Sequence, residues 1–141
     1  MAEISTQIVI DAVTLALRSA FPEAPIITAE DIEQGNEYGS FLVQLVSSSQ
    51  QQFLGERYKR VPIIDVVYFG ETIASCISVA DELSMALKTI TTPMQDVLHG
   101  NNIEWRVEGD ILHFIVHYRH FIRVKHPKEE METLTILKGG Q

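Results

Sequence analysis

Residues 42–69 read LVQLVSSSQQQFLGERYKRVPIIDVVYF, and this stretch decides how the chain is organised. Two apolar runs, 41–46 and 61–69, have the composition of β-strands and flank a polar segment, 47–60. Pro62 lies near the start of the second run and predicts an edge or an entry point, because proline cannot donate to a strand ladder. The pattern predicts two strands joined by a long loop, and such loops in compact domains are usually functional or mobile.

The end of this polar segment is basic. Arg57, Lys59 and Arg60 lie within four residues, although the chain as a whole has a net charge of −8. One interpretation is a solvated loop end whose charges aid solubility. The other is a docking surface for an acidic partner, and composition alone leaves both open.

The composition predicts one globular domain that is made in a reducing cytoplasm. The chain has 141 residues, of which 45% are hydrophobic and 21% charged, and this length is enough for one core. A single cysteine, Cys76, excludes an intrachain disulfide. The start, Met1-Ala2-Glu3, does not resemble a secretory signal, and no apolar run approaches the length of a membrane span.

The acidic balance argues against one class of function. There are 19 Asp and Glu residues against 11 Lys and Arg, whereas proteins that grip a phosphate backbone do so with basic side chains. Specific DNA binding and membrane binding are therefore not expected.

Two stretches have the periodicity of amphipathic helices. Residues 4–21 leave only a narrow polar stripe, so the surplus apolar surface is either buried in the same domain or covered by another subunit. Residues 71–90 place Ile73, Cys76, Ile77 and further apolar residues on one face. Between these helices, the turn-rich acidic stretch 25–39 is expected to be a solvated loop, with Ile26-Ile27 as a short edge strand.

Residues 103–124 predict a second hairpin. A Gly109-Asp110 turn pairs Val107 with Leu112 and continues in that register toward residues 103 and 116. The strand from 111 to 124 alternates for 14 residues, about 46 Å, whereas a domain of this size is roughly 37 Å across. This strand must therefore bend, break or project. The expected fold is α+β, with two helices packed on a mainly antiparallel sheet built from two hairpins.

No residue pattern nominates an active site or a metal site. His113 and His117 lie about 13 Å apart on one strand face and His120 faces the other way, so they do not share an ion, and a cross-strand place such as His113 beside Arg106 is expected. Cys76 is expected to be an inert buried thiol. Asp65 is either a buried catalytic carboxylate or a structural one that faces water or pairs with a basic residue across the sheet.

Several short stretches, in this order and spacing, carry a resemblance to a known family. They are Ala20-Phe21-Pro22 at the end of a helix, Ile32-Glu33-Gln34-Gly35, Phe41-Leu42-Val43 leading to Ser47-Ser48-Ser49-Gln50, Arg57-Tyr58-Lys59-Arg60, Asp65 to Phe69, and Leu112-His113-Phe114. Over roughly residues 3–124, the chain resembles the small tail terminator proteins of phage and prophage tail modules. The resemblance favours docking as the role of the basic cluster, with Arg57, Tyr58, Lys59, Arg60 and Gln50 as partner-binding residues.

The resemblance also implies a structural role with no cofactor and no enzymatic activity. It implies that copies form a homo-oligomeric, hexameric ring that caps the tail tube, ends tube polymerisation and offers a joining surface to the head connector or neck protein, with the sheath protein as a further partner. Six chains would together carry about −48, so DNA would pass through the lumen without sticking. The protein is then expected in the host cytoplasm during assembly and in the virion tail afterwards.

Two alternatives to tail termination stay open on the sequence. One is another neck or head-completion ring protein, since these are also small α+β ring formers. The other is a small enzyme or ligand-binding domain, which a pocket converging on Asp65 and histidines would favour.

The C-terminal end lies outside the resemblance. Residues 1–128 are expected to form one domain, with 129–141 as a tail. Because Thr133-Leu134-Thr135-Ile136-Leu137 is a β-prone apolar run near a chain end, this tail is expected to become ordered against a neighbouring subunit or a tail protein.

Overall fold

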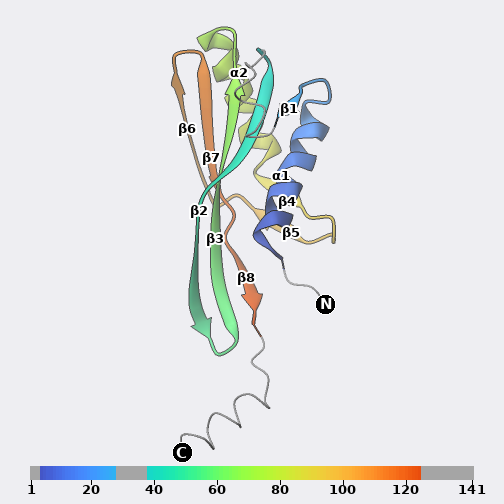
Figure 1. The fold of residues 1–141 in the computed structure, drawn as a ribbon, viewed down its shortest axis with the longest axis vertical. Coiled ribbons are helices and arrows are strands. Elements are labelled where there is room, and N and C mark those ends of the chain that lie inside the picture. The colour runs from blue at the N-terminus through green and yellow to red at the C-terminus, as the bar shows by residue number, and fades with distance from the viewer. Residues whose placement is uncertain (1–3, 28–37, 125–141) are drawn as a thin grey trace, which may run out of the picture.

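A curved sheet and two helices make up the fold (Figure 1), in a computed structural model that describes residues 4–27 and 38–124. The elements along the chain are α1 (Thr6–Ala20), β1 (Ile26–Ile27), β2 (Ser40–Leu54), β3 (Arg57–Phe69), α2 (Ile73–Ala86), β4 (Thr89–Thr91), β5 (Val97–His99), β6 (Asn102–Glu108), β7 (Ile111–His117) and β8 (His120–Arg123). Residues 28–37, within the predicted acidic loop, and residues 125–141, including the run 133–137, lie outside the described residues. The predicted domain boundary at 128 therefore stays a prediction.

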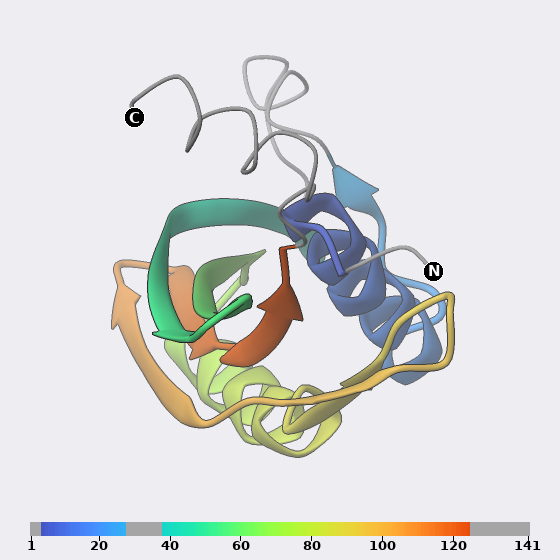
Figure 2. The same ribbon diagram turned by 90° about the horizontal axis from the view of Figure 1, so that it is seen from below.

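The sheet is mostly antiparallel, but it is more than two hairpins. Its strand order is β1-β2-β3-β7-β6, with β8 also paired to β3, and β1 adds in parallel beside β2. β4 and β5 form a separate two-stranded hairpin whose first strand contacts both helices. Figure 2 looks along the long axis and shows how strongly the sheet curves beside the helices. The α+β architecture agrees with the prediction, whereas the two-hairpin sheet was too simple.

The helices begin at sequence-encoded caps and pack on one face of the sheet. The hydroxyl of Ser5 accepts from the backbone N–H of Ile8, and Thr72 forms a capping box with Ser75. One core cluster joins both helices to the inward-facing side chains of β2, β3 and β7. Its fully buried members include Val9, Val13, Leu17, Phe41, Ile64, Leu83, Leu112, Phe114 and Tyr118.

The second helix differs from its prediction in length and in its apolar face. It ends at Ala86, because Leu87 is its C-cap and Ile90 belongs to β4. Ile73 and Ile77 are 58% and 44% exposed, although the periodicity placed them on the buried face. The side chains that are buried instead, including Val79, lie slightly further round the helix.

The β6–β7 hairpin has the predicted register. Val107 pairs with Leu112, Trp105 with Phe114 and Ile103 with Val116. Gly109 has a positive φ of 67°, as a turn with glycine first requires.

The long strand after Gly109-Asp110 is interrupted at Tyr118 and Arg119, and Pro62 is the physical reason. β7 ends opposite Ile63 and β8 starts opposite Arg60, so the register continues unchanged across the gap. The backbone N–H of Tyr118 donates to the carbonyl of Pro62 at 3.1 Å, but Pro62 has no N–H to return. The Tyr118 carbonyl instead accepts from Nδ1 of His120 at 3.0 Å.

Pro62 therefore does not mark an edge or an entry point, as the sequence suggested. It lies inside β3, with Ser48 of β2 on one side and Tyr118 on the other. The proline is tolerated there because a histidine side chain supplies the donor that the ladder lacks.

The prediction of a 14-residue loop at residues 47–60 is wrong, because most of these residues are in strands. Residues 47–60 form the outer halves of β2 and β3, and only Gly55 and Glu56 lie between the last pair, Leu54 and Arg57. Gly55 has a φ of +57° and permits this tight turn. The polar residues are consistent with a strand because residues 47–54 are exposed on both faces, so no apolar alternation is needed there.

Candidate functional site

The outer part of the β2–β3 hairpin forms a three-stranded extension with β8. We call residues 46–61 together with His120–Arg123 the arm. From Ser47 to Leu54 it is roughly 23 Å long, at about 3.3 Å per residue. Figure 1 shows the arm extending along the long axis beyond both helices. It contains every predicted partner-binding residue.

The strand geometry divides the predicted basic cluster between two faces of the arm. Alternate residues of β3 point to opposite faces, so Arg57 and Lys59 share one face while Tyr58 and Arg60 share the other. The partners on β8 follow the same division, because Phe121 lies beside Lys59 and is 40% exposed, while the residues beside Tyr58 and Arg60 are buried. Arg57 and Lys59 are thus on the more open face.

Arg60 and Gln50 lie together at the base of the arm. Nη2 and Nε of Arg60 donate to Oε1 of Gln50 at 2.6 and 3.1 Å, across the β2–β3 pair. Nη1 of Arg60 donates to the carbonyl of Ile4 at 3.4 Å. The bonds to Gln50 hold the two strands of the arm together, and the bond to Ile4 joins the arm to the chain just before α1. Arg60 therefore has a structural role as well as a charge.

Arg57 lies on two aromatic rings near the tip. Its guanidinium carbon is 4.8 Å from the ring centroid of Phe121 and 5.6 Å from that of Phe53. The two rings are themselves 5.1 Å apart. Such stacking holds the guanidinium in place while leaving its charge at the surface.

The arm is unusual in both apolarity and charge. Its exposed large hydrophobic residues are Val46, Phe53, Leu54 and Phe121. It also carries Arg57, Lys59, Arg60 and Arg123 against Glu56 alone, a formal charge of +3 in a chain of −8. A basic, partly apolar projection on an acidic protein is a surface suited to contact with another molecule.

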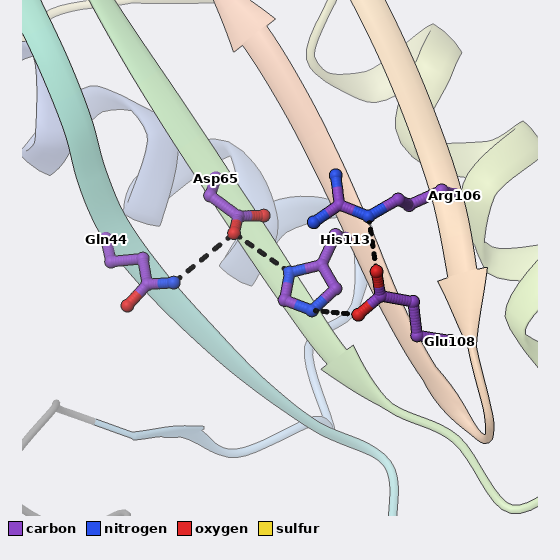
Figure 3. Close-up of polar contacts among 5 residues, drawn as sticks. All are labelled: Gln44, Asp65, Arg106, Glu108 and His113. Carbon is purple, nitrogen blue, oxygen red and sulfur yellow. Dashed lines mark hydrogen bonds and ion pairs between the residues drawn. The ribbon is translucent and has the colours of Figure 1, made fainter.

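A second polar cluster lies on the sheet face opposite the helices (Figure 3). Asp65 is 6% exposed, and its Oδ2 lies 3.0 Å from Nδ1 of His113 and 3.3 Å from Nε2 of Gln44. Nε2 of His113 is 3.8 Å from Glu108, which accepts a 2.8 Å hydrogen bond from Arg106. That bond lowers the pKa of Glu108 and raises the pKa of Arg106.

This cluster matches the structural interpretation of Asp65. The carboxylate is buried and paired across the sheet with a histidine, and His113 lies beside Arg106 in the predicted register. Two surface grooves lie at the helices, and neither is lined by Asp65 or a histidine. Neither groove is therefore the pocket at Asp65 and histidines that would favour an enzyme or a ligand-binding domain.

Cys76 is fully buried, as predicted. Burial raises the pKa of its thiol, and its Sγ donates weakly to the Asp110 carbonyl at 3.4 Å. Within residues 4–27 and 38–124, no three His, Cys, Asp or Glu side chains are grouped to hold a metal ion. The absence of a cofactor from the whole protein stays a prediction.

Comparison with known families settles which class of protein this is. A model of the phage tail terminator protein family matches residues 8–132. The chain belongs to this family. The resemblance found in the sequence is thereby confirmed, and it gives the protein a structural role in the phage tail, as a virion tail component associated with other tail proteins.

A search of curated proteins finds no significant match. Among the described residues, no helix has the length and apolarity needed to cross a membrane.

Sequence reasoning missed the apolar part of the arm. Phe53 and Leu54 precede the Gly55-Glu56 turn, and Phe121 comes from a strand more than 60 residues later. A two-residue turn with glycine first, between two strand-like runs, was the local signal for the hairpin. No local signal joins Phe121 to Phe53, because that contact depends on β8 pairing with β3.

Proposed function

We propose that this protein ends the phage tail tube: copies form a ring, sixfold as in the family, that caps the finished tube and stops further addition of tube subunits. The ring also offers the surface to which the head connector or neck protein docks. The observation that carries this proposal is the arm, because Val46, Phe53, Leu54 and Phe121 are exposed there beside basic side chains, and neither helix covers them. In a ring, a head-to-tail contact that closes on rotation buries one such surface on every copy.

The proposed mechanism is steric and electrostatic, not chemical. One face of the ring meets the tube and the other meets the neck, so the tube end is no longer free to add subunits. Arg57, Tyr58, Lys59, Arg60 and Gln50 are the proposed partner-binding residues. Acidic charge elsewhere on the ring would keep DNA from adhering to the lumen.

Electron microscopy of particles assembled without this protein tests the proposal. Tails much longer than normal are expected, because nothing else would stop the tube. Tails of normal length without attached heads would instead show a neck or head-completion protein, the alternative within the same assembly. Adding back the purified protein during assembly should restore the tail length and serves as the control.

A direct binding assay separates capping from indirect effects on assembly. Purified protein should sediment as a ring at least in the presence of tail tubes. A protein that stays monomeric and never sediments with tubes would contradict the proposal.

A further inference from the structure

The two helices carry a groove whose charge is opposite to that of the arm. A groove of about 430 Å³ lies between α1 and β4, and a second of about 490 Å³ adjoins it, because Ala20 and Ala86 line both. We call the two together the helix groove. Its other lining residues include Ala12, Leu15, Ala16, Asp81, Glu82 and Met85.

Most of the lining side chains are small, and the two charged ones, Asp81 and Glu82, are both acidic. Leu15 and Met85 lie at the surface there, 48% and 75% exposed. The helix groove is therefore shallow, with exposed apolar side chains and negative charge beside it.

The arm has the complementary features. Phe53 and Leu54 are 54% and 67% exposed at its tip. Arg57 and Lys59 lie on its open face, and the arm carries +3, which leaves −11 on the rest of the chain. A protruding apolar and basic tip thus matches a shallow groove on the same molecule that is lined by apolar and acidic side chains.

One chain does not bring these two surfaces together. In Figure 1 the arm runs along the long axis past both helices, and its tip lies away from the end of α2 that lines the groove. When two complementary surfaces lie apart on one molecule, a contact between them joins two copies head to tail.

We infer that the arm of one copy docks into the helix groove of the next copy. Phe53 and Leu54 would then cover the small side chains of the groove, while Arg57 and Lys59 face Asp81 and Glu82. This inference rests on the proposed ring and names the contact that closes it. It also assigns a use to the surplus apolar surface of α1, because Leu15, Ala16 and Ala12 line the groove.

Cross-linking between two different variants tests the contact. L54C carries a thiol at the tip of the arm and M85C carries one beside the groove, and Cys76 is buried in both. Mixed with a short bismaleimide under ring-forming conditions with tail tubes, the two variants should give a cross-linked dimer. Neither variant alone should do so, and L54C mixed with E104C, whose thiol lies on exposed β6, is the matched control.

Charge exchange tests the same contact without new thiols. R57E/K59E and D81K/E82K should each weaken ring formation at least about tenfold, because like charges then face each other across the contact. The variant that combines all four changes should regain most of the lost association, which a merely misfolded arm would not allow. E104K serves as a control for an acidic residue outside the groove and should behave as wild type.

The outcomes separate this inference from the proposed function. Rings that cap tubes but show no tip-to-groove cross-link and no charge rescue would overturn the inference and leave capping intact. Failure of the wild-type protein to form rings or bind tubes would overturn both. A cross-link with rescue supports the contact.

Discussion

At the scale of single residues, the buried carboxylate of Asp65 is only 6% exposed. Leu42 and Val67 belong to a small apolar cluster on the same face of the sheet. A charge in such a place is stabilised only when hydrogen bonds replace water. His113 and Gln44 both provide such bonds to Oδ2, whereas Oδ1 has no hydrogen-bond partner among the described residues. The Oδ2 contacts are therefore expected to matter for stability.

The first prediction concerns this pair. H113A should lower the free energy of unfolding by about 1.5–3 kcal/mol, because it removes a hydrogen bond to a charged, buried acceptor. R106A changes an exposed ion pair on the same face, which solvent screens, and should lower the free energy of unfolding much less than H113A does. Urea denaturation of the two variants measures the difference.

A second substitution tests whether the unpaired Asp65 carboxylate causes the destabilisation by H113A. D65N in the H113A background should recover part of the loss, since a neutral amide tolerates a missing partner better than a carboxylate does. Equal destabilisation by H113A and R106A would show that the Asp65 contact contributes little.

At the scale of elements, the junction between β7 and β8 connects the body to the arm. Tyr118 lies at this junction and is fully buried. Its hydroxyl donates a 2.7 Å hydrogen bond to the carbonyl of Leu87 at the end of α2. The Tyr118 side chain therefore connects the helix layer to the point where Pro62 interrupts the sheet.

The second prediction tests this connection. Y118F should lower the free energy of unfolding by about 1–2 kcal/mol, because it leaves the buried Leu87 carbonyl without its partner. Y38F, at a tyrosine that is 62% exposed, should change it by less than about 0.5 kcal/mol. Similar values for both variants would contradict a structural role for the hydroxyl.

The pH dependence of the same variant gives an independent measurement. Burial raises the pKa of Tyr118 far above its ordinary value of 10.0. Stability from the neutral tyrosine is therefore fully present below pH 10 and is lost as the pH rises above it, because the unfolded chain releases the proton first. Y118F should lose less stability than wild type in that alkaline range.

At the scale of the whole molecule, the described residues bring both helices and the sheet into one core cluster, which runs from Val9 to Tyr118. We expect this core to fold on its own, so deleting residues 132–141 should leave the monomer folded, with a nearly unchanged melting temperature. Association with the ring or the tail should weaken, as the β-prone run 133–137 is lost.

Thermal melting and sedimentation with tubes together check this third prediction. A truncated chain that no longer folds would show that Leu134, Ile136 and Leu137 belong to the domain core. A truncated chain that forms rings and caps tubes as well as wild type would show that the tail takes no part in association.

The sequence by itself determined the elements whose signals are local. Ser5 and Thr72 cap the helices, and Gly109-Asp110 sets the register of the last hairpin. The resemblance to tail terminators was also readable, because it depends on the order and spacing of short stretches along the chain. Each of these features is decided by residues that are close in sequence.

Only the tertiary structure decided how the arm is built. The polar residues of segment 47–60 would suit either a loop or an exposed strand. The segment forms two strands because its halves pair with each other and β8 pairs with the second half. The same pairing places Arg57 over the rings of Phe53 and Phe121 and puts Tyr58 and Arg60 on the opposite face. Contacts between residues so far apart in the chain depend on how the whole sheet assembles, and no local pattern encodes them.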